Sequence, residues 1–481
     1  MTGRSKLPYC APCALLALLF ACSRSEEATA ERPAGAPDVV IVLVDTLRAD
    51  FTELGGRTGT SPRLAELATE SVVFESASSP APWTLPSVTS LFTGRHLAEH
   101  GVLHDRLRLP DSATTLAEQL SEAGFRTASY HRNPYAGERF GLHQGFDRVE
   151  QRDGSTGAEH LRDFWREVGE APYLLYVHNT EPHDLLLVRE RFRRGSDPAF
   201  LEEYARRVRE LRTLTRVDFA AGREVGATDN TAEQQAELDG LDALRPEVLS
   251  LYEASVRDAD ERIGSIVDAL RERGSWNRTL FIVVSDHGEE MGEHEGWQHD
   301  QSVYQELVHV PLLVRFPDAR HGGRRVRRPV SLVDLLPTIL EVAGLEDTEQ
   351  EHSGLSLLRQ LEEEAQPLPR LVSMRHNRKK YFRPFKESRG DLNLVVRQGR
   401  WKAIVNLETD GVELYDLDED PGEQDDLARR EPERATELER FARARHEELR
   451  ARSTPAAPGG PRGASTEALR ALRDLGYVGD E

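Results

Sequence analysis

Four short segments of the chain consist almost entirely of apolar residues, many of them β-branched. Runs of this length and composition are typical of strands that are buried on both faces, as in a parallel sheet. The first of them ends abruptly in Asp45, which is a sharp boundary between a buried strand and a polar loop. We therefore predict four strands, at Val39 to Val44, Tyr173 to Val177, Leu280 to Val284 and Val310 to Val314.

Segments with helical apolar spacing lie between these runs. Ser61 and Pro62 are typical of an N-cap followed by Pro at the first helical position, and they predict a helix to about Glu70. Two more helices are predicted at Ala113 to Ala123 and at Tyr252 to Glu272. The alternation extends over roughly 300 residues, and it predicts an α/β fold with a doubly wound, mainly parallel sheet and helices on both faces.

The polar pattern divides the rest of the chain. Within a large domain of residues 38–366, about residues 189–243 are rich in Arg, Glu and Ala and predict a helical insertion. Residues 367–450 contain short strand-like segments typical of hairpins, so we expect a small carboxy-terminal α+β subdomain with a short antiparallel sheet. The strand-like segments of the subdomain are Leu392 to Arg397, Arg400 to Asn406 and Gly411 to Asp416. Residues 451–481 are predicted to form a Pro/Gly linker followed by a terminal helix at Thr466 to Leu475.

The amino terminus has the pattern of an export signal. Arg4 and Lys6 precede the mostly apolar stretch Ala11 to Ala21, which is too short to span a bilayer. Leu19-Phe20-Ala21-Cys22 resembles a bacterial lipobox, which implies a lipoprotein signal peptide at residues 1–21 and a membrane anchor through lipid on Cys22. We expect an exported cell-envelope lipoprotein, on the periplasmic side or at the outer membrane, with a flexible tether at residues 22–37. The alternative is simple cleavage and a periplasmic or secreted protein.

Charge and cysteine content exclude several classes of function. The formal net charge of the 481 residues is −21, so no basic field is available to neutralise the phosphates of a nucleic acid. All three Cys lie within the first 22 residues. The body of the chain therefore has no disulfide, no thiolate metal site and no cysteine nucleophile.

Polar residues that carry chemistry follow three of the predicted strands. Asp45 follows the first, His178 and then His183 follow the second, and Asp286 and His287 follow the third. Ligands of open α/β sheets gather at the carboxyl ends of strands, and carboxylates with imidazoles suit a divalent metal. The alternative for each residue alone is structural: such an Asp often caps a helix, and a lone His is often a core or surface residue.

A second candidate lies in the segment Ser79 to Gly94. Pro86 is predicted near the first position of a helix that extends to about Thr93, with Thr84 just ahead of it. Free backbone amides and the positive end of the helix dipole meet there, which suits a sulfuryl or phosphoryl group. The alternative is that Thr84 is a simple N-cap.

These segments together resemble the sulfatase family of the alkaline phosphatase superfamily. Thr84-Leu85-Pro86-Ser87-Val88 is similar to its Cys-X-Pro-Ser-Arg element, and the stretch from His178 to His183 to its His-X-X-Asp-Pro-His element. Ser285-Asp286-His287-Gly288 matches its metal-binding element, and the stretch from His299 to Tyr304 resembles its next loop. The similarity extends in order from Val39 to about Leu427.

The resemblance implies a metal-dependent hydrolase of sulfate or phosphate esters with an anionic ester as substrate. It implies that Asp45, Thr84, Asp286 and His287 bind one divalent ion, calcium or manganese with zinc as an alternative, and it does not exclude a second ion. It also implies that Thr84 is the nucleophile. The remaining histidines would contact the anion or the leaving group (His183 and His299) or assist nearby (His178).

Three positions depart from the family pattern. Thr84 replaces the Cys that the family oxidises, so we expect no formylglycine. Val88 replaces an Arg, and Thr46 replaces a second metal-binding Asp of many members. Two alternatives follow: a phosphodiesterase or phosphoryl transferase of the same superfamily, and a non-catalytic binding lipoprotein that kept the fold.

Overall fold

The computed structural model describes residues 35–183, 185, 192, 197–214, 232–346, 352–362, 368–376 and 392–459. The predicted signal peptide, most of the predicted tether and the predicted terminal helix lie outside these residues. All of the described residues belong to one compact unit, Arg32–Glu481. Within it, no described helix is both long enough and apolar enough to cross a bilayer.

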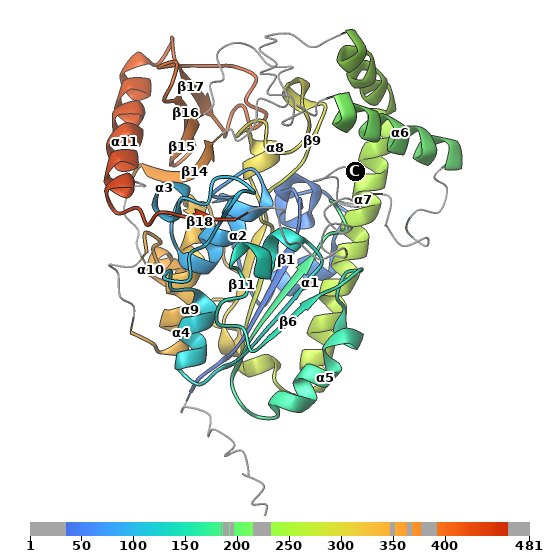
Figure 1. Cartoon of the computed structure of the whole chain (residues 1–481), viewed down its shortest axis with the longest axis vertical. Coiled ribbons are helices and arrows are strands. Elements are labelled where there is room, and N and C mark those ends of the chain that lie inside the picture. Colours follow the sequence, from blue (N-terminus) through green and yellow to red (C-terminus); the bar gives the residue numbers. More distant parts are fainter. Residues whose placement is uncertain are drawn as a thin grey trace, which may run out of the picture. The chain divides into compact units, whose positions relative to one another are not determined.

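A sheet of eight strands, most of them parallel, lies at the centre of the fold (Figure 1). Strand β1 pairs in parallel with both β7 and β8, and β5 and β6 continue the parallel part. Strand β11 is antiparallel to both β8 and β2. The order is β12 (Arg325–Val326), β2 (Val72–Phe74), β11 (Leu312–Arg315), β8 (Thr279–Val284), β1 (Asp38–Val44), β7 (Tyr173–Asn179), β5 (Arg126–His131), β6 (Arg148–Gln151).

Helices cover both faces of this sheet. Val39, Ile41 and Leu43 of β1 belong to one hydrophobic core, and the residues between them belong to the other. Because successive side chains of a strand point to opposite faces, a strand buried on both faces must be apolar throughout. One face is covered by α2 (Thr84–Thr93), α4 (Leu116–Glu122), α9 (Leu335–Ala343) and α10 (Leu357–Glu362), and the other by α1 (Pro62–Ala68), α5 (Ala158–Val168) and α7 (Ala232–Glu272).

The structure confirms the predicted fold class and corrects several element bounds. The four predicted strands are β1, β7, β8 and β11, but β11 begins at Leu312 because Pro311 has no N–H to donate to the ladder. Helix α7 extends from the predicted insertion through Pro246 to Glu272, as one helix of 41 residues. Helix α6 (Pro198–Leu214) lies in the predicted insertion.

The carboxy-terminal region contains a separate antiparallel sheet of four strands. The three predicted strands are present, and β14, which the pattern did not predict, completes the sheet. One face packs on α11 (Pro432–Ala451), and the other contacts Val303, Tyr304 and α8 (Gln305–Val308). The strands are β14 (Arg370–His376), β15 (Leu392–Gln398), β16 (Trp401–Asn406) and β17 (Val412–Asp416).

The remaining short elements connect these parts. They are the helix α3 (Leu97–His100) and three two-stranded ribbons, β3 (Ala77–Ser78) with β13 (Val330–Ser331), β4 (Leu107–Arg108) with β18 (Ala457–Pro458), and β9 (Glu290–Met291) with β10 (Trp297–Gln298).

Candidate functional site

The ends of β1 and β8 bring three metal-ligating side chains together. Asp45 directly follows β1, and Asp286 and His287 follow β8, which is paired with β1 in parallel. One ligand atom from each of the three side chains lies within 4.8 Å of the others, and all three residues are fully buried. The structure therefore brings together the three side chains that the strand-end pattern singled out.

Two carboxylate oxygens of this cluster lack a hydrogen-bond donor. Asp45 Oδ1 and Asp286 Oδ2 are buried, and no described residue donates to either of them. His287 Nε2 is 3.5 Å from Asp45 Oδ1 and 3.6 Å from Asp286 Oδ2, a distance beyond a hydrogen bond. Because a buried carboxylate oxygen without a donor is costly, these two oxygens and the imidazole nitrogen fit a divalent cation between them.

The two carboxyl groups respond to burial in different ways. Burial raises the pKa of Asp286 well above its usual value, and the charge of Asp45 raises it further. Burial also acts to raise the pKa of Asp45, but His183, His178 and His287 hold it well below its usual value. Burial and His299 lower the pKa of His287, so its imidazole is neutral and suited to bind a metal.

Thr84 is the first residue of α2, and its hydroxyl faces the cluster. Its Oγ1 is 3.3 Å from His287 Nε2. The sequence prediction that Thr84 precedes the helix and that Pro86 lies near its first position is wrong, because Trp83 is the N-cap and Pro86 is the third helical residue. Pro is tolerated throughout the first turn, where backbone N–H groups have no intrahelical partner.

Asn133 joins the carboxylate to the hydroxyl, and the sequence analysis missed it. Its Nδ2 donates to Asp45 Oδ2 at 2.7 Å and to Thr84 Oγ1 at 3.2 Å. Its Oδ1 accepts from the Tyr135 N–H at 3.0 Å, which fixes the orientation of the amide. Asn133 follows the end of β5 by two residues. The strand-end rule would have found it if β5 had been predicted.

Ser79 and Ser87, the latter in α2, both bond to the loop that contains Asp286. The Ser87 hydroxyl donates to the Asp286 carbonyl at 2.7 Å, and the Ser79 hydroxyl donates to the same oxygen. Ser87 lies one turn along α2 from Thr84. The helix that begins at Thr84 is therefore bonded directly to the backbone of Asp286.

The loop after β1 is held in an unusual conformation. Thr46 has a φ of 57°, which is left-handed and uncommon for a β-branched residue. The Tyr252 hydroxyl of α7 donates to the Thr46 carbonyl at 2.5 Å and accepts from the Arg48 N–H at 2.9 Å. These two bonds fix the turn that follows Asp45.

The three predicted histidines lie in different settings. His178 is fully buried, with Nε2 3.1 Å from Asp45 Oδ2 and Nδ1 3.0 Å from the Tyr176 hydroxyl, so both of its nitrogens are used within the protein. His183 and His299 are partly exposed, and their ring centroids are 5.2 Å apart. Burial acts to lower the pKa of His299, but Glu289 at 3.1 Å raises it above its usual value. His299 is therefore suited to carry a proton.

The side of the site near His183 and His299 is partly apolar. A small pocket there is lined by Leu185, by Tyr204 and Val208 of α6 in the inserted segment, and by Leu241 of α7. Trp297, of β10, also lines it. The helical insertion therefore forms part of the wall beside the candidate site.

Comparisons with known proteins show the family of the chain. The family model described as sulfatase matches residues 37–345, which is more than half of the 481 residues. The chain belongs to the sulfatase family. A second family model, described as the carboxy-terminal part of N-sulphoglucosamine sulphohydrolase, matches residues 292–451.

Individual relatives of the sulfatase family share low sequence identity with the chain or match only part of it. Arylsulfatase K of Xenopus laevis is 31% identical over 202 residues, which are 41% of this chain and 37% of the relative. With arylsulfatase K of Canis lupus familiaris the identity is 24%, over 85% of this chain and 82% of the relative. The structure of a phosphonate monoester hydrolase of Agrobacterium radiobacter has a TM-score of 0.61 at 21% identity, and the match covers 88% of this chain and all of that one.

Proposed function

We propose that the protein is a metal-dependent hydrolase of sulfate or phosphate esters, with the Thr84 hydroxyl as nucleophile. One observation carries the proposal. The Thr84 hydroxyl stands at the start of α2, 3.3 Å from His287 Nε2, beside two buried carboxylate oxygens that no described donor satisfies. Membership of the sulfatase family supports the reaction class.

The donor set fits one divalent cation, with calcium, manganese or zinc as candidates. Asp45, Asp286 and His287 would hold it, with Thr84 as a further ligand. When bound, such a cation neutralises the carboxylates and the ester oxygens and lowers the pKa of a coordinated hydroxyl.

The surrounding side chains have distinct roles in the proposed reaction. The amide of Asn133 orients the Thr84 hydroxyl, and the amino-terminal end of α2 stabilises the anionic ester group. The Thr84 hydroxyl gives its proton to water as Oγ1 bonds to sulfur or phosphorus and the bond to the leaving oxygen breaks, and His299 or His183 gives that oxygen a proton. A water molecule then attacks sulfur or phosphorus, and the bond to Oγ1 breaks. One proton of the attacking water passes to Oγ1, which restores the hydroxyl and releases the oxyanion.

Thr84 leaves phosphoryl chemistry as a second candidate. A threonine ester cannot be cleared by the collapse of an aldehyde hydrate, so both steps are displacements at sulfur or phosphorus. Because Val88 stands where the family pattern has an Arg, the nucleophile also has one cation fewer beside it than in that pattern. The structural likeness to a phosphonate monoester hydrolase is compatible with this candidate. A purely binding role is less favoured, because a site without a cation has no physical need for two buried carboxylate oxygens that lack a donor.

The test compares two threonines of one helix. Thr84→Ala removes the proposed nucleophile, whereas Thr93→Ala removes a buried hydroxyl that donates to the Thr89 carbonyl at 2.7 Å. We expect protein supplied with calcium, manganese or zinc to hydrolyse an aryl sulfate, aryl phosphate or aryl phosphodiester. Thr84→Ala should lower kcat by about a thousandfold or more, and Thr93→Ala should leave it nearly unchanged.

Two results would contradict the proposal. One is the absence of turnover with every metal and substrate of the panel. The other is a Thr84→Ala variant that turns over as fast as Thr93→Ala.

A further inference from the structure

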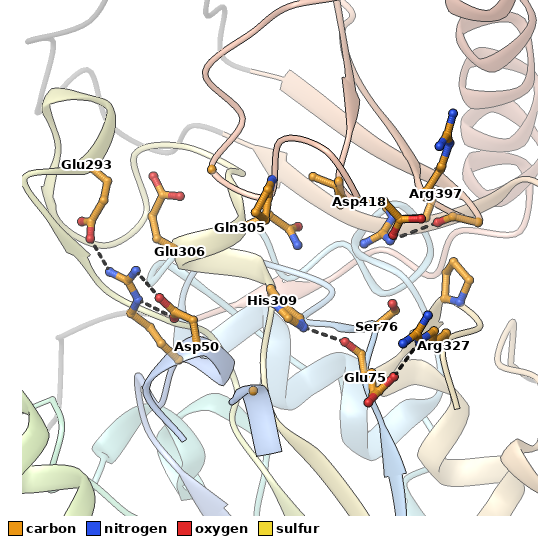
Figure 2. Close-up of a pocket in the computed structure, with 18 of the residues that line it drawn as sticks. Asp50, Glu75, Ser76, Glu293, Gln305, Glu306, His309, Arg327, Arg397 and Asp418 are labelled. Carbon is orange, nitrogen blue, oxygen red and sulfur yellow. Dashed lines mark hydrogen bonds and ion pairs between the residues drawn. The ribbon is translucent and has the colours of Figure 1, made fainter. Parts of the chain in front are cut away.

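A second cavity lies between the large sheet and the carboxy-terminal sheet (Figure 2). Its volume is about 840 Å³. Its walls come from loops of the large domain around Glu75 and His309 and from carboxy-terminal residues such as Arg397 and Asp418. None of the four proposed metal ligands lines it. The volume is in the range of sites that bind small organic molecules.

Arg397 contributes a buried positive charge to this cavity. The residue is in β15 and is only 4% exposed. Its Nη2 donates to the Gly399 carbonyl at 3.1 Å, but its Nε is buried and bonds to no acceptor among the described residues. Burial lowers the pKa of Arg397 to about 10, so the guanidinium is still charged at neutral pH.

The carboxylates on the cavity wall form no ion pair with Arg397. Four of them are already bonded to other cations, and the exposed Asp418, like Glu423, acts on Arg397 only through its charge, which opposes the lowering of the pKa by burial. A buried guanidinium whose Nε lacks an acceptor is unfavourable, and an oxyanion would supply that acceptor and a directly bonded counter-charge. The four bonded pairs are Asp50 with Arg48 at 2.9 Å, Glu75 with Arg327 at 3.2 Å, Glu293 with Arg48 at 2.9 Å and Glu306 with His294 at 2.6 Å.

Neutral polar groups lie on the same walls. Ser76 and Gln305 are partly exposed there, and His309 Nε2 donates to the Glu75 carbonyl at 2.9 Å (Figure 2). These groups suit the polar body of a ligand whose charged end is on Arg397. The cavity is larger than one inorganic oxyanion needs, so the ligand has an organic part.

We propose that this cavity is a second binding site, for a small polar organic molecule that carries a sulfate, phosphate or carboxylate group, with Arg397 as its charged contact. The site is independent of Thr84 and of the proposed ester hydrolysis. It is expected to bind its ligand equally well in a catalytically inactive protein.

Calorimetric titration in an inactive background tests the proposal. In the full-length Asp286→Asn protein, glucose 6-sulfate and glucose 6-phosphate are the probes. We expect one equivalent of at least one probe to bind. Adding Arg397→Gln should weaken that binding about tenfold or more, because the charged hydrogen bonds are lost. Adding Arg400→Gln is the matched control, since Arg400 also lines the cavity but is half exposed and paired with Asp416 at 3.1 Å.

Equal affinities of the Arg397→Gln and Arg400→Gln proteins, or no binding of either probe, would overturn the proposal. A crystallographic measurement on the unmutated protein does not depend on how the variants fold. Crystals soaked in selenate should give an anomalous selenium peak beside the Arg397 guanidinium, and peaks only elsewhere would count against the site. Failure of ester hydrolysis would leave both measurements unaffected.

Discussion

Two clusters of fully buried charges lie in different parts of the molecule and differ in how they are compensated. At the candidate site, Asp45 and Asp286 each have one oxygen without a described donor. Beneath the carboxy-terminal sheet, Lys402 Nζ lies 2.6 Å from Glu423 Oε1, and both side chains are 0% exposed. Lys402 also donates to the Val303 carbonyl at 2.8 Å, and Glu423 accepts from the Gln305 N–H at 2.6 Å.

The difference shows what marks a functional cluster. Both clusters are fully buried, so burial alone does not distinguish a functional cluster from a structural one. The pair of Lys402 and Glu423 finds its counter-charges within the chain and joins β16 to the segment that contains α8. The carboxylates of Asp45 and Asp286 leave bonding capacity unused, which indicates a ligand supplied from outside.

The largest expected effect is at Asp286. Asp286→Asn should remove the metal and lower kcat by about a thousandfold or more. In EDTA, however, the variant should be at least as stable as the unmutated protein, because a costly buried carboxyl next to Asp45 is gone. Metal analysis by mass spectrometry, kinetics and urea unfolding measure the three quantities.

The matched control for this variant is Asp334→Asn. Asp334 is equally buried, but its carboxylate is paired with Arg370 at 2.7 Å. This variant should lose stability in EDTA by about 3 kcal/mol, since it leaves a guanidinium unpaired. If the two variants lost similar stability, the proposed distinction between compensated and uncompensated carboxylates would be wrong.

At Lys402 we expect an effect on stability without a direct effect on the proposed chemistry. Lys402→Met leaves Glu423 buried without its counter-charge and should lower the free energy of unfolding by about 3–5 kcal/mol. The double variant with Glu423→Gln should recover at least part of that loss, because no charge is left unpaired. Urea unfolding measures both. A double variant that is less stable than Lys402→Met would show that the pair is not a self-contained unit.

The smallest effect is a pH dependence at His294, which neighbours this pair. Burial acts to lower the pKa of His294, but Glu306 at 2.6 Å raises it above 6.5. A histidine whose pKa is higher in the folded state than in the unfolded state stabilises the folded state when it is protonated. This stabilisation is complete below the unfolded-state pKa of 6.5, and it is lost as the pH rises through the higher folded-state pKa. His294→Gln should therefore cost about 1 kcal/mol more at pH 6 than at pH 9. Urea unfolding at both pH values tests this, and a cost independent of pH would contradict it.

The sequence predicted the parts of the molecule whose environment is uniform. Strands β1, β7 and β8 are buried on both faces, so their apolar runs identified them, and with them Asp45, Asp286 and His287 at their ends. Strand β5 reads Arg-Thr-Ala-Ser-Tyr-His, which has no apolar run, and Asn133 was missed with it.

The carboxy-terminal charges were missed for a different reason. Arg397 and Lys402 lie in strands whose pattern is that of a sheet with one solvated face. They are buried because the rest of the chain packs against the sheet, with α11 on one side and the α8 segment on the other. Such burial depends on tertiary contacts that neither residue type nor spacing reveals.

Helix α7 has a consequence for the engineering of this protein. Near its start, Leu241 forms part of the apolar wall beside His183 and His299, whereas Tyr252, about 16 Å further along the helix, fixes the turn after Asp45. One helix thus contributes both to the apolar wall and to the turn that follows Asp45. Libraries that vary α6 and the first turns of α7 up to Pro246 should alter which esters are accepted, while the half that follows Pro246 is best kept constant.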